Sequence, residues 1–340
     1  MSYQADVVGD SHDTADPILS VEHLSVQFAV GGQWVTAVDD VSFAVAPGET
    51  VGIVGESGSG KSVTSLAVMG LLSAPGARVT QGRVLLDGVD LLTLSERDLS
   101  RVRGMQIAMV FQEPMTSLNP AFSVGGQIAE IVRRHLRVSR STAREIAVDY
   151  LRRVGIPDPA GQFDRYPHEF SGGMRQRVMI AMAICCHPKL LIADEPTTAL
   201  DVTIQAQILD LLREMCAEFG IALLFITHSM GVVADICDRV MVMYAGQVVE
   251  TAGVFELFGS PRHPYTEALL RAIPPLTPTA GSLPSVPGSP PPPGQSTPGC
   301  RFADRCSYAA PECRLGPIPL YELGPGGTCR CVRAGDGARD

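Results

Sequence analysis

The sequence predicts an α/β fold in which a parallel sheet carries helices on both faces, together with an antiparallel β part and a helical insert. Strands and helices alternate along residues 171–244, a pattern that is typical of a parallel sheet. Earlier in the chain, the short apolar strand Thr50–Val54 runs into a glycine-rich turn, and apolar residues with helical spacing follow it. Nearer the N-terminus, two strand-like stretches meet at Gly31-Gly32, a hairpin signal that predicts the antiparallel part.

Each predicted element follows from its local pattern. The hairpin pairs Ile18–Val30 with Trp34–Val45, and a helix is expected over Lys61–Leu72. Residues 124–155 have the apolar spacing of two helices, and Gly155 ends the second. The later predictions are helix 172–186, strand 189–194, helix 203–219, strand 221–227, helix 229–237 and strand 239–244.

The composition of the 340 residues is that of an ordinary globular protein, with 45% hydrophobic and 19% charged residues. The net charge of −9 argues against non-specific binding of nucleic acid, which requires a basic face. No apolar run reaches the roughly 18 residues of a transmembrane helix. The stretch Met1–Pro17 is polar and acidic and lacks the order of a signal peptide. We therefore expect a disordered leader and a cytoplasmic protein.

Composition changes sharply near residue 274. The run Pro290–Pro293 and many Ser, Gly and Thr residues mark 274–298 as an extended linker, because such a segment cannot form a core. A cysteine-rich tail follows it. We expect a leader at 1–17, a large domain at 18–260 with a helical insert at about 113–170, and a C-terminal extension at 261–340 that contains linker 274–298 and tail 299–333.

The glycine-rich turn has the sequence GESGSGKS over Gly55–Ser62 and matches the P-loop pattern between a predicted strand and a predicted helix. Its glycines allow the backbone to wrap closely around phosphates, so that main-chain N–H groups face the negative charge. Lys61 is expected to contact the β- and γ-phosphates, and the Ser62 hydroxyl to bind Mg²⁺. The predicted ATP-binding positions are Gly55, Ser57, Gly58, Ser59, Gly60, Lys61, Ser62 and the next position, which Val63 occupies.

A second motif delivers two adjacent carboxylates, Asp194 and Glu195, at the end of the apolar strand that begins near Leu190. The carboxyl ends of the strands are where ligands sit in open α/β sheets. Because successive strand residues point in opposite directions, the two acids should have different roles. We expect Asp194 to hold Mg²⁺ and Glu195 to act as the general base for the attacking water. The position of the pair, about 130 residues after the P-loop, strengthens both assignments.

Further segments resemble a known family. Ser171–Gln176, with the sequence SGGMRQ, resembles the signature of ABC ATPases, in which a capping serine and two glycines open a helix. Ala199–Asp201 resembles the family's D-loop, His228 its switch histidine and Gln112 the glutamine of its Q-loop. On these motifs the chain is identified as a member of the ABC ATPases over about residues 18–273.

The resemblance implies a P-loop ABC ATPase with a RecA-like parallel core, an antiparallel β subdomain and an α-helical subdomain. It also implies a head-to-tail dimer, in which the signature of one subunit meets the γ-phosphate held by the other. Gln112 would join Mg²⁺ and the attacking water to the helical subdomain, and His228 would contact the γ-phosphate. The family places an aromatic ring against adenine. Phe28 lies in the matching strand, and Trp34 across the hairpin is the alternative.

The segment Pro261–Thr266, with the sequence PRHPYT, resembles the C-terminal extension of the dipeptide, oligopeptide and nickel importers. Gly172–Ile180 resembles the first of the two ATPases of that subfamily. The resemblance implies a peptide-import motor at the cytoplasmic face of the cell membrane. Its partners would be a second ATPase in a heterodimer, two transmembrane permeases and an extracytoplasmic solute-binding protein. The alternatives are import of nickel or another small solute, and a soluble ABC ATPase outside transport.

Five cysteines lie within the 32 residues Cys300–Cys331. Reducing conditions disfavour disulfides in the cytoplasm, so four thiolates would suit Zn²⁺ or an iron–sulfur cluster. The spacing lacks the C-x₂-C pairs usual for zinc, which favours a [4Fe–4S] cluster over zinc or unliganded thiols. The tail also resembles that of peptide-importer ATPases, some of which carry such a cluster. The resemblance implies the ligands Cys300, Cys306, Cys313 and Cys331 and leaves Cys329 as the spare, although a slip of one residue would exchange the last two.

Overall fold

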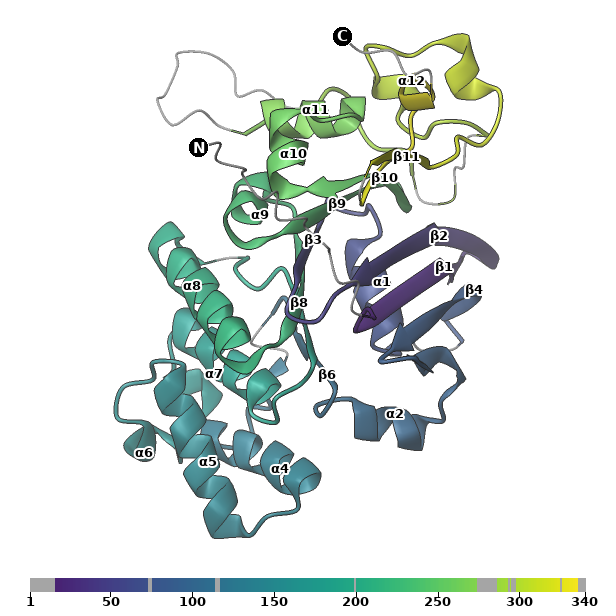
Figure 1. Cartoon of the computed structure of the whole chain (residues 1–340). Helices are drawn as coiled ribbons and strands as arrows, with labels where there is room; N and C mark the ends of the chain where they lie inside the picture. Colours follow the sequence, from purple (N-terminus) through teal and green to yellow (C-terminus); the bar gives the residue numbers. More distant parts are fainter. Residues whose placement is uncertain are drawn as a thin grey trace, which may run out of the picture.

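A computed structural model describes residues 16–72, 75–113, 117–198, 200–273, 286–292, 294, 298–324 and 326–335. Most of the predicted leader (1–17) and much of the predicted linker (274–298) lie outside the described residues, as do Ala199 and Pro325. Two sheets form the centre of the molecule (Figure 1). A group of helices lies at one end, and the C-terminal tail, drawn in yellow, lies at the other.

The N-terminal sheet is antiparallel and has the strand order β2-β1-β4-β5. Strands β1 and β2 confirm the predicted hairpin, because their pairing continues as far as Val30 and Gln33, the residues on either side of the turn. Gly31 and Gly32 have φ angles of 57° and 80°, the left-handed conformation that a two-residue hairpin turn requires. The strands are β1 (Leu19–Val30), β2 (Gln33–Val45), β4 (Ala77–Leu86) and β5 (Val89–Asp90).

In the part of the chain that the structure describes, the larger sheet has eight strands in the order β11-β12-β10-β9-β3-β8-β7-β6. Strands β9, β3, β8, β7 and β6 are parallel to one another, as the strand–helix alternation predicted. The remaining three strands continue the sheet in antiparallel fashion. The strands are β3 (Thr50–Val54), β6 (Ile107–Val110), β7 (Leu190–Asp194), β8 (Ala222–Thr227), β9 (Arg239–Tyr244), β10 (Gln247–Gly253), β11 (Tyr321–Gly324) and β12 (Gly327–Cys329).

Two hydrophobic clusters cover the two faces of this sheet. Alternation along β7 sends Leu191 and Ala193 into one cluster and Leu190 and Ile192 into the other. The first cluster contains residues of helices α7, α8 and α9, and the second contains residues of α1 and of the antiparallel sheet. These helices are α1 (Lys61–Val68), α7 (Gly172–Ile184), α8 (Val202–Phe219) and α9 (Met230–Ile236).

Two helices occupy 124–155, as predicted, and side chains of Ser123 and Ser139 cap their N-termini. With α7 they form the helical group at the lower end of Figure 1. In the described part of the chain, no helix is long and apolar enough to cross a membrane. The remaining helices and 3₁₀ turns are α2 (Glu96–Val102), α4 (Val124–Leu136), α5 (Arg140–Arg153), α6 (Pro159–Gln162), α10 (Val254–Gly259), α11 (Pro264–Arg271), α12 (Val332–Gly335), η1 (Leu91–Thr93), η2 (Pro167–Glu169), η3 (Ala303–Arg305) and η4 (Pro311–Arg314).

The helix predicted over Lys61–Leu72 is wrong at its C-terminal end, because α1 stops at Val68. Gly70 takes a φ of 63°, and the Leu71 N–H donates to the Leu66 carbonyl at 2.8 Å, which closes the last turn. Apolar spacing continues beyond this point, but the glycine ends the helix. The other predicted helices and strands of the core match the structure to within about two residues, a normal margin for element ends.

The C-terminal tail joins the main sheet, which the sequence did not predict. Strand β12 pairs with β10 through Glu250↔Cys329 and Thr251↔Thr328, and β11 pairs with β12. These strands have only three or four residues and contain glycine, so they lack the alternation by which strands are recognised. The tail is thus part of the sheet that carries the P-loop.

Candidate functional site

The P-loop connects β3 to α1, as its motif requires. A side chain at position 55 would lie 2.2 Å from the Met243 carbonyl oxygen, and one at position 60 would lie 2.9 Å from the Ala37 carbonyl oxygen. Only glycine fits such close approaches of backbone to backbone. Gly58 and Gly60 also have φ angles of 78° and 103°. The N-cap of α1 is Gly60, which has no side chain to cap the first N–H groups of the helix.

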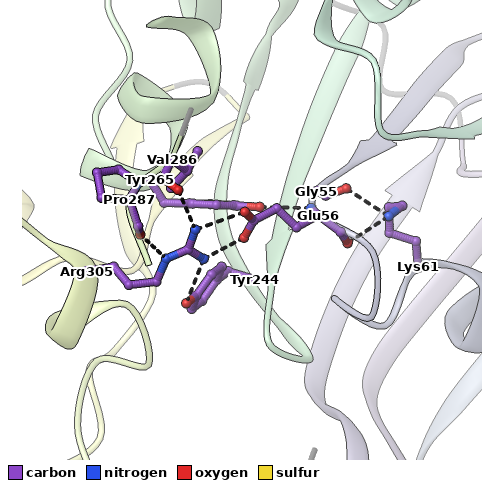
Figure 2. Close-up of polar contacts among 8 residues, drawn as sticks. All are labelled: Gly55, Glu56, Lys61, Tyr244, Tyr265, Val286, Pro287 and Arg305. Carbon is purple, nitrogen blue, oxygen red and sulfur yellow. Dashed lines mark hydrogen bonds and ion pairs between the residues drawn. The ribbon is translucent and has the colours of Figure 1, made fainter. Parts of the chain in front are cut away.

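Lys61 and Ser62 begin α1 and point to different partners. The buried Lys61 ammonium donates to the carbonyl oxygens of Gly55 at 2.8 Å and Glu56 at 3.0 Å (Figure 2). Burial lowers the pKa of Lys61, although three nearby carboxylates act in the opposite direction. Ser62 Oγ donates to Asp194 Oδ1 at 3.0 Å. Burial raises the pKa of Asp194, and the Ser62 hydrogen bond partly offsets that rise.

Glu195 lies one residue beyond β7 and is the centre of a polar cluster. Its Oε2 accepts from Gln112 Nε2 at 3.1 Å and from Thr198 Oγ1 at 2.9 Å. His228 Nδ1 lies 3.3 Å from its Oε1. Glu195 has a φ of 46°, which turns its side chain away from the direction that continued strand geometry would give. The predicted Gln112, Glu195 and His228 are therefore together, and Asp194 has a separate partner.

Sheet order explains this meeting. Gln112 follows β6, Glu195 follows β7 and His228 follows β8, and these three strands are parallel neighbours. The carboxyl ends of parallel neighbours lie at one edge of a sheet, beside the P-loop that follows β3.

A cavity of about 1150 Å³ joins this cluster to the P-loop and the hairpin. Phe28 and Trp34 both line it, so the geometry leaves both as candidate contacts for a base. The Trp34 ring already has the Arg78 guanidinium 3.9 Å from its centroid, whereas Phe28 is half-buried in the hairpin. The other predicted residues that line the cavity are Ser57, Gly58, Ser59, Gly60, Lys61, Ser62, Val63, Gln112, Glu195 and His228.

The signature segment opens α7 as predicted, with Ser171 Oγ accepting from the Met174 N–H at 3.4 Å. Ser171 and Gly172 are exposed and do not line the cavity of their own chain. Of the D-loop motif, Ala199 lies outside the described residues. Asp201 Oδ1 accepts from the Ile204 N–H at 3.0 Å and caps α8.

The cysteines of the tail surround a second, much smaller cavity. Cys300, Cys306, Cys313 and Cys331 line it, whereas the fully buried Cys329 belongs to β12 and does not. Burial raises the pKa of the Cys300 thiol to about 11. Within the described ranges, no three Cys, His, Asp or Glu side chains are grouped closely enough to hold one metal ion.

The motifs did not point to several residues that the structure brings to the site. Thr198 reaches Glu195 from the turn after β7, and its only sequence signal is its position three residues downstream. Glu56 is an unspecified position of the P-loop pattern, yet its carboxylate pairs with Arg305 of the tail at 2.6 Å. No local pattern could have indicated that pair.

Comparisons with known proteins agree with this fold and site. Residues 38–198 match the ABC transporter family. The structure is similar to the ATP-binding cassette MJ0796 in a dimeric post-hydrolysis state bound to ADP and Pi, with a TM-score of 0.63, 26% identity, and coverage of 69% of this chain and 98% of that chain. It is also similar to cbiO1 from Clostridium perfringens, part of the ABC transporter complex cbiONQ, with a TM-score of 0.61, 30% identity, and coverage of 72% and 92%. Fold and site thus define an ABC transporter ATPase.

The C-terminal region indicates to which group of ABC transporter ATPases the chain belongs. Residues 249–313 match the oligopeptide/dipeptide transporter C-terminal region. The sequence is 51% identical to the dipeptide transport ATP-binding protein DppD of Escherichia coli (strain K12) over 314 residues, which are 92% of this chain and 96% of that protein. The chain belongs to the ATP-binding proteins of the dipeptide/oligopeptide ABC transporter family.

Proposed function

We propose that this ATPase lies at the cytoplasmic face of the cell membrane and drives the import of dipeptides or oligopeptides into the cell. The observation that carries the ATPase activity is the Glu195 carboxylate, held by Gln112 and close to His228 at the edge of the P-loop cavity. The match of 249–313 to the oligopeptide/dipeptide region supports this solute class, as does the likeness to a dipeptide transport protein.

ATP would bind through the P-loop. The backbone N–H groups of Ser57 to Gly60 and the Lys61 ammonium, which now donates to two loop carbonyls, would turn to the phosphates. Ser62 and Asp194 place two oxygen ligands side by side, which suits Mg²⁺. When bound, Mg²⁺ neutralises charge on the β- and γ-phosphates.

Hydrolysis would depend on Glu195 as the general base that takes a proton from the attacking water. Gln112 and Thr198 both donate to one carboxylate oxygen, so they hold the base in a single orientation. His228 is 60% exposed and lies at the other oxygen, where it can reach a γ-phosphate in the cavity. Phe28 remains our choice for the adenine contact, because Arg78 already covers the Trp34 ring.

The signature would act on the other subunit of a dimer. Ser171 and Gly172 are exposed and do not line the cavity of their own chain, and Asp201 of the D-loop is also exposed. The solved relative MJ0796 forms a dimer with ADP and Pi, which supports a composite site. ATP would close the dimer, and hydrolysis would reset it. The expected partners are a second ATPase, two permeases and an extracytoplasmic solute-binding protein.

We further propose that the chain divides, as the sequence indicates, into an ATPase domain at 18–260 and an extension at 261–340. We also propose that the extension holds a [4Fe–4S] cluster. Cys300, Cys306, Cys313 and Cys331 would hold it. Four thiols around one cavity form a donor set that fits an iron–sulfur cluster. The spacing of these cysteines lacks the C-x₂-C pairs usual for a structural zinc ion. The cluster would supply folding free energy to the tail.

The test combines hydrolysis with transport. The chain alone should hydrolyse ATP poorly, and assembly with its partner ATPase, the permeases and the binding protein in liposomes should restore hydrolysis and drive the uptake of labelled dipeptide. Full turnover by a demonstrated monomer would refute the composite site. Uptake of nickel without any peptide would refute the solute class but leave the motor assignment intact.

A further inference from the structure

The outer side of the P-loop is held by the C-terminal extension. Figure 2 shows Glu56 between two partners, with its backbone carbonyl directed to Lys61 and its carboxylate directed to Arg305. The Glu56 N–H donates to the buried Tyr265 hydroxyl of α11 at 2.9 Å. Two residues of the extension therefore fix one position of the phosphate-binding loop.

Arg305 is unusually well anchored for a residue of a short tail. Its guanidinium forms a two-bond pair with Glu56 at 2.6 and 2.9 Å and also donates to Tyr244 Oη at 3.2 Å. The other two bonds reach the carbonyl oxygens of Val286 at 3.3 Å and Pro287 at 2.7 Å. All five N–H groups of the guanidinium are thus used, and the side chain is only 5% exposed.

Aromatic packing and a short turn keep this guanidinium in place. Its central carbon lies 5.6 Å from the Tyr244 ring centroid and 5.8 Å from that of Phe302. Arg305 ends η3, the turn that separates Cys300 from Cys306. The same turn therefore positions the guanidinium and two of the thiols of the cysteine cavity.

The charge of Glu56 acts on the phosphate site. Glu56 borders the Lys61 ammonium, which donates to the Glu56 carbonyl oxygen at 3.0 Å. Lys61 is expected to bind the triphosphate, so an unpaired Glu56 would add a negative charge next to an anionic ligand. A two-bond pair with arginine neutralises that charge and fixes its direction.

From this geometry we propose that Arg305 is a positioning residue of the nucleotide site, through which the cysteine-rich tail controls the affinity of the P-loop for ATP. It neutralises Glu56 and keeps the carboxylate on the outer side of the loop. The proposal rests on ATP binding at this P-loop. It assigns to the tail a role in the ATP site of its own chain.

The experiment measures the Kd for ATP of the full-length chain by equilibrium dialysis without magnesium, so that hydrolysis does not interfere. Arg305→Met keeps an apolar stem but removes the charge and all five donors, and it should raise the Kd about tenfold or more. Adding Glu56→Gln to that variant removes the unpaired charge and should bring the Kd back to within about threefold of the wild type.

Arg314→Met is the matched control, because Arg314 belongs to the same tail but pairs with Asp304 on the surface. It should bind ATP as the wild type does. Iron and sulfide contents of Arg305→Met should equal those of the wild type, which would show that the tail is intact. Wild-type affinity in Arg305→Met would overturn the proposal, and so would an equally weak double variant. If Lys61→Ala also bound ATP normally, the P-loop assignment itself would be wrong.

Discussion

The nucleotide cavity and the cysteine cavity are built in different ways. Around the nucleotide cavity, Gln112, Glu195 and His228 follow neighbouring strands of one sheet. Around the cysteine cavity, the thiols come from turns and 3₁₀ helices between Cys300 and Cys331. Strand β12 attaches that region to the sheet through β10.

This difference decides whether a short sequence motif is enough to predict which side chains lie together. A strand end has a fixed place in a sheet, so a short motif after an apolar strand predicts which side chains meet. Turns have no fixed position in a sheet, and their geometry depends on what they pack against and on what they bind. The two regions are nevertheless joined by the ion pair between Glu56 of the P-loop and Arg305, which ends the turn between Cys300 and Cys306. Substitutions on each side of that junction test how far the cavities depend on each other.

The largest effect should come from Glu195→Gln at the nucleotide cavity. This change keeps the shape of the side chain but removes the base, so hydrolysis should slow by at least about a hundredfold. ATP should still bind, and the closed dimer should accumulate. Steady-state phosphate release and size-exclusion chromatography with ATP measure the two results. The control is Glu218→Gln on the exposed face of α8, which should hydrolyse normally, and an active Glu195→Gln enzyme would mean that another group activates the water.

A smaller but still large effect is expected for Lys61→Ala. The remaining N–H groups cannot neutralise a triphosphate alone, so the Kd for ATP should rise by about thirtyfold or more. The chain contains one other lysine, Lys189, which is exposed and pairs with Asp87. Lys189→Ala is therefore a natural control and should bind ATP normally in the same dialysis assay. Equal affinities in the two variants would contradict the P-loop assignment.

On the cysteine side, Cys331→Ser should lose most of the iron and sulfide of anaerobically purified protein. Cys329→Ser should keep both, because Cys329 lies in β12 and does not line the cavity. Since the tail presents Arg305, the Cys331 variant should also bind ATP up to about tenfold more weakly. Metal analysis and the visible absorption spectrum decide the first point. Zinc without iron or sulfide in the wild type would end the cluster proposal.

Sequence patterns predicted those parts of the molecule in which local chemistry determines the geometry. The hairpin followed from Gly31-Gly32, and the parallel core followed from apolar strands alternating with helices. The meeting of Gln112, Glu195 and His228 could be expected because each follows a strand. The family resemblance supplied their roles, which remain predictions.

Contacts between distant segments could not be predicted in this way. Glu56 and Arg305 are 249 positions apart, and the local sequence pattern around each of them does not specify which residue stands there. The strands of the tail are too short for alternation to be visible, and they form because β10 offers a free edge. Tyr265 lay in a segment recognised by resemblance, but its hydrogen bond to the P-loop is a matter of packing.

The smallest effect should separate the two contacts that the extension makes with Glu56. Tyr265→Phe removes the hydroxyl that accepts the Glu56 N–H but leaves the ring packed against Tyr244, 4.6 Å away between centroids. One neutral hydrogen bond is worth about 1 kcal/mol, so the Kd for ATP should rise only about threefold to fivefold. Tyr166→Phe is the control, because Tyr166 is an exposed tyrosine, and it should not change the Kd for ATP. If Tyr265→Phe weakened ATP binding as much as Arg305→Met, the backbone position of the loop, and not the charge of Glu56, would be what the extension controls.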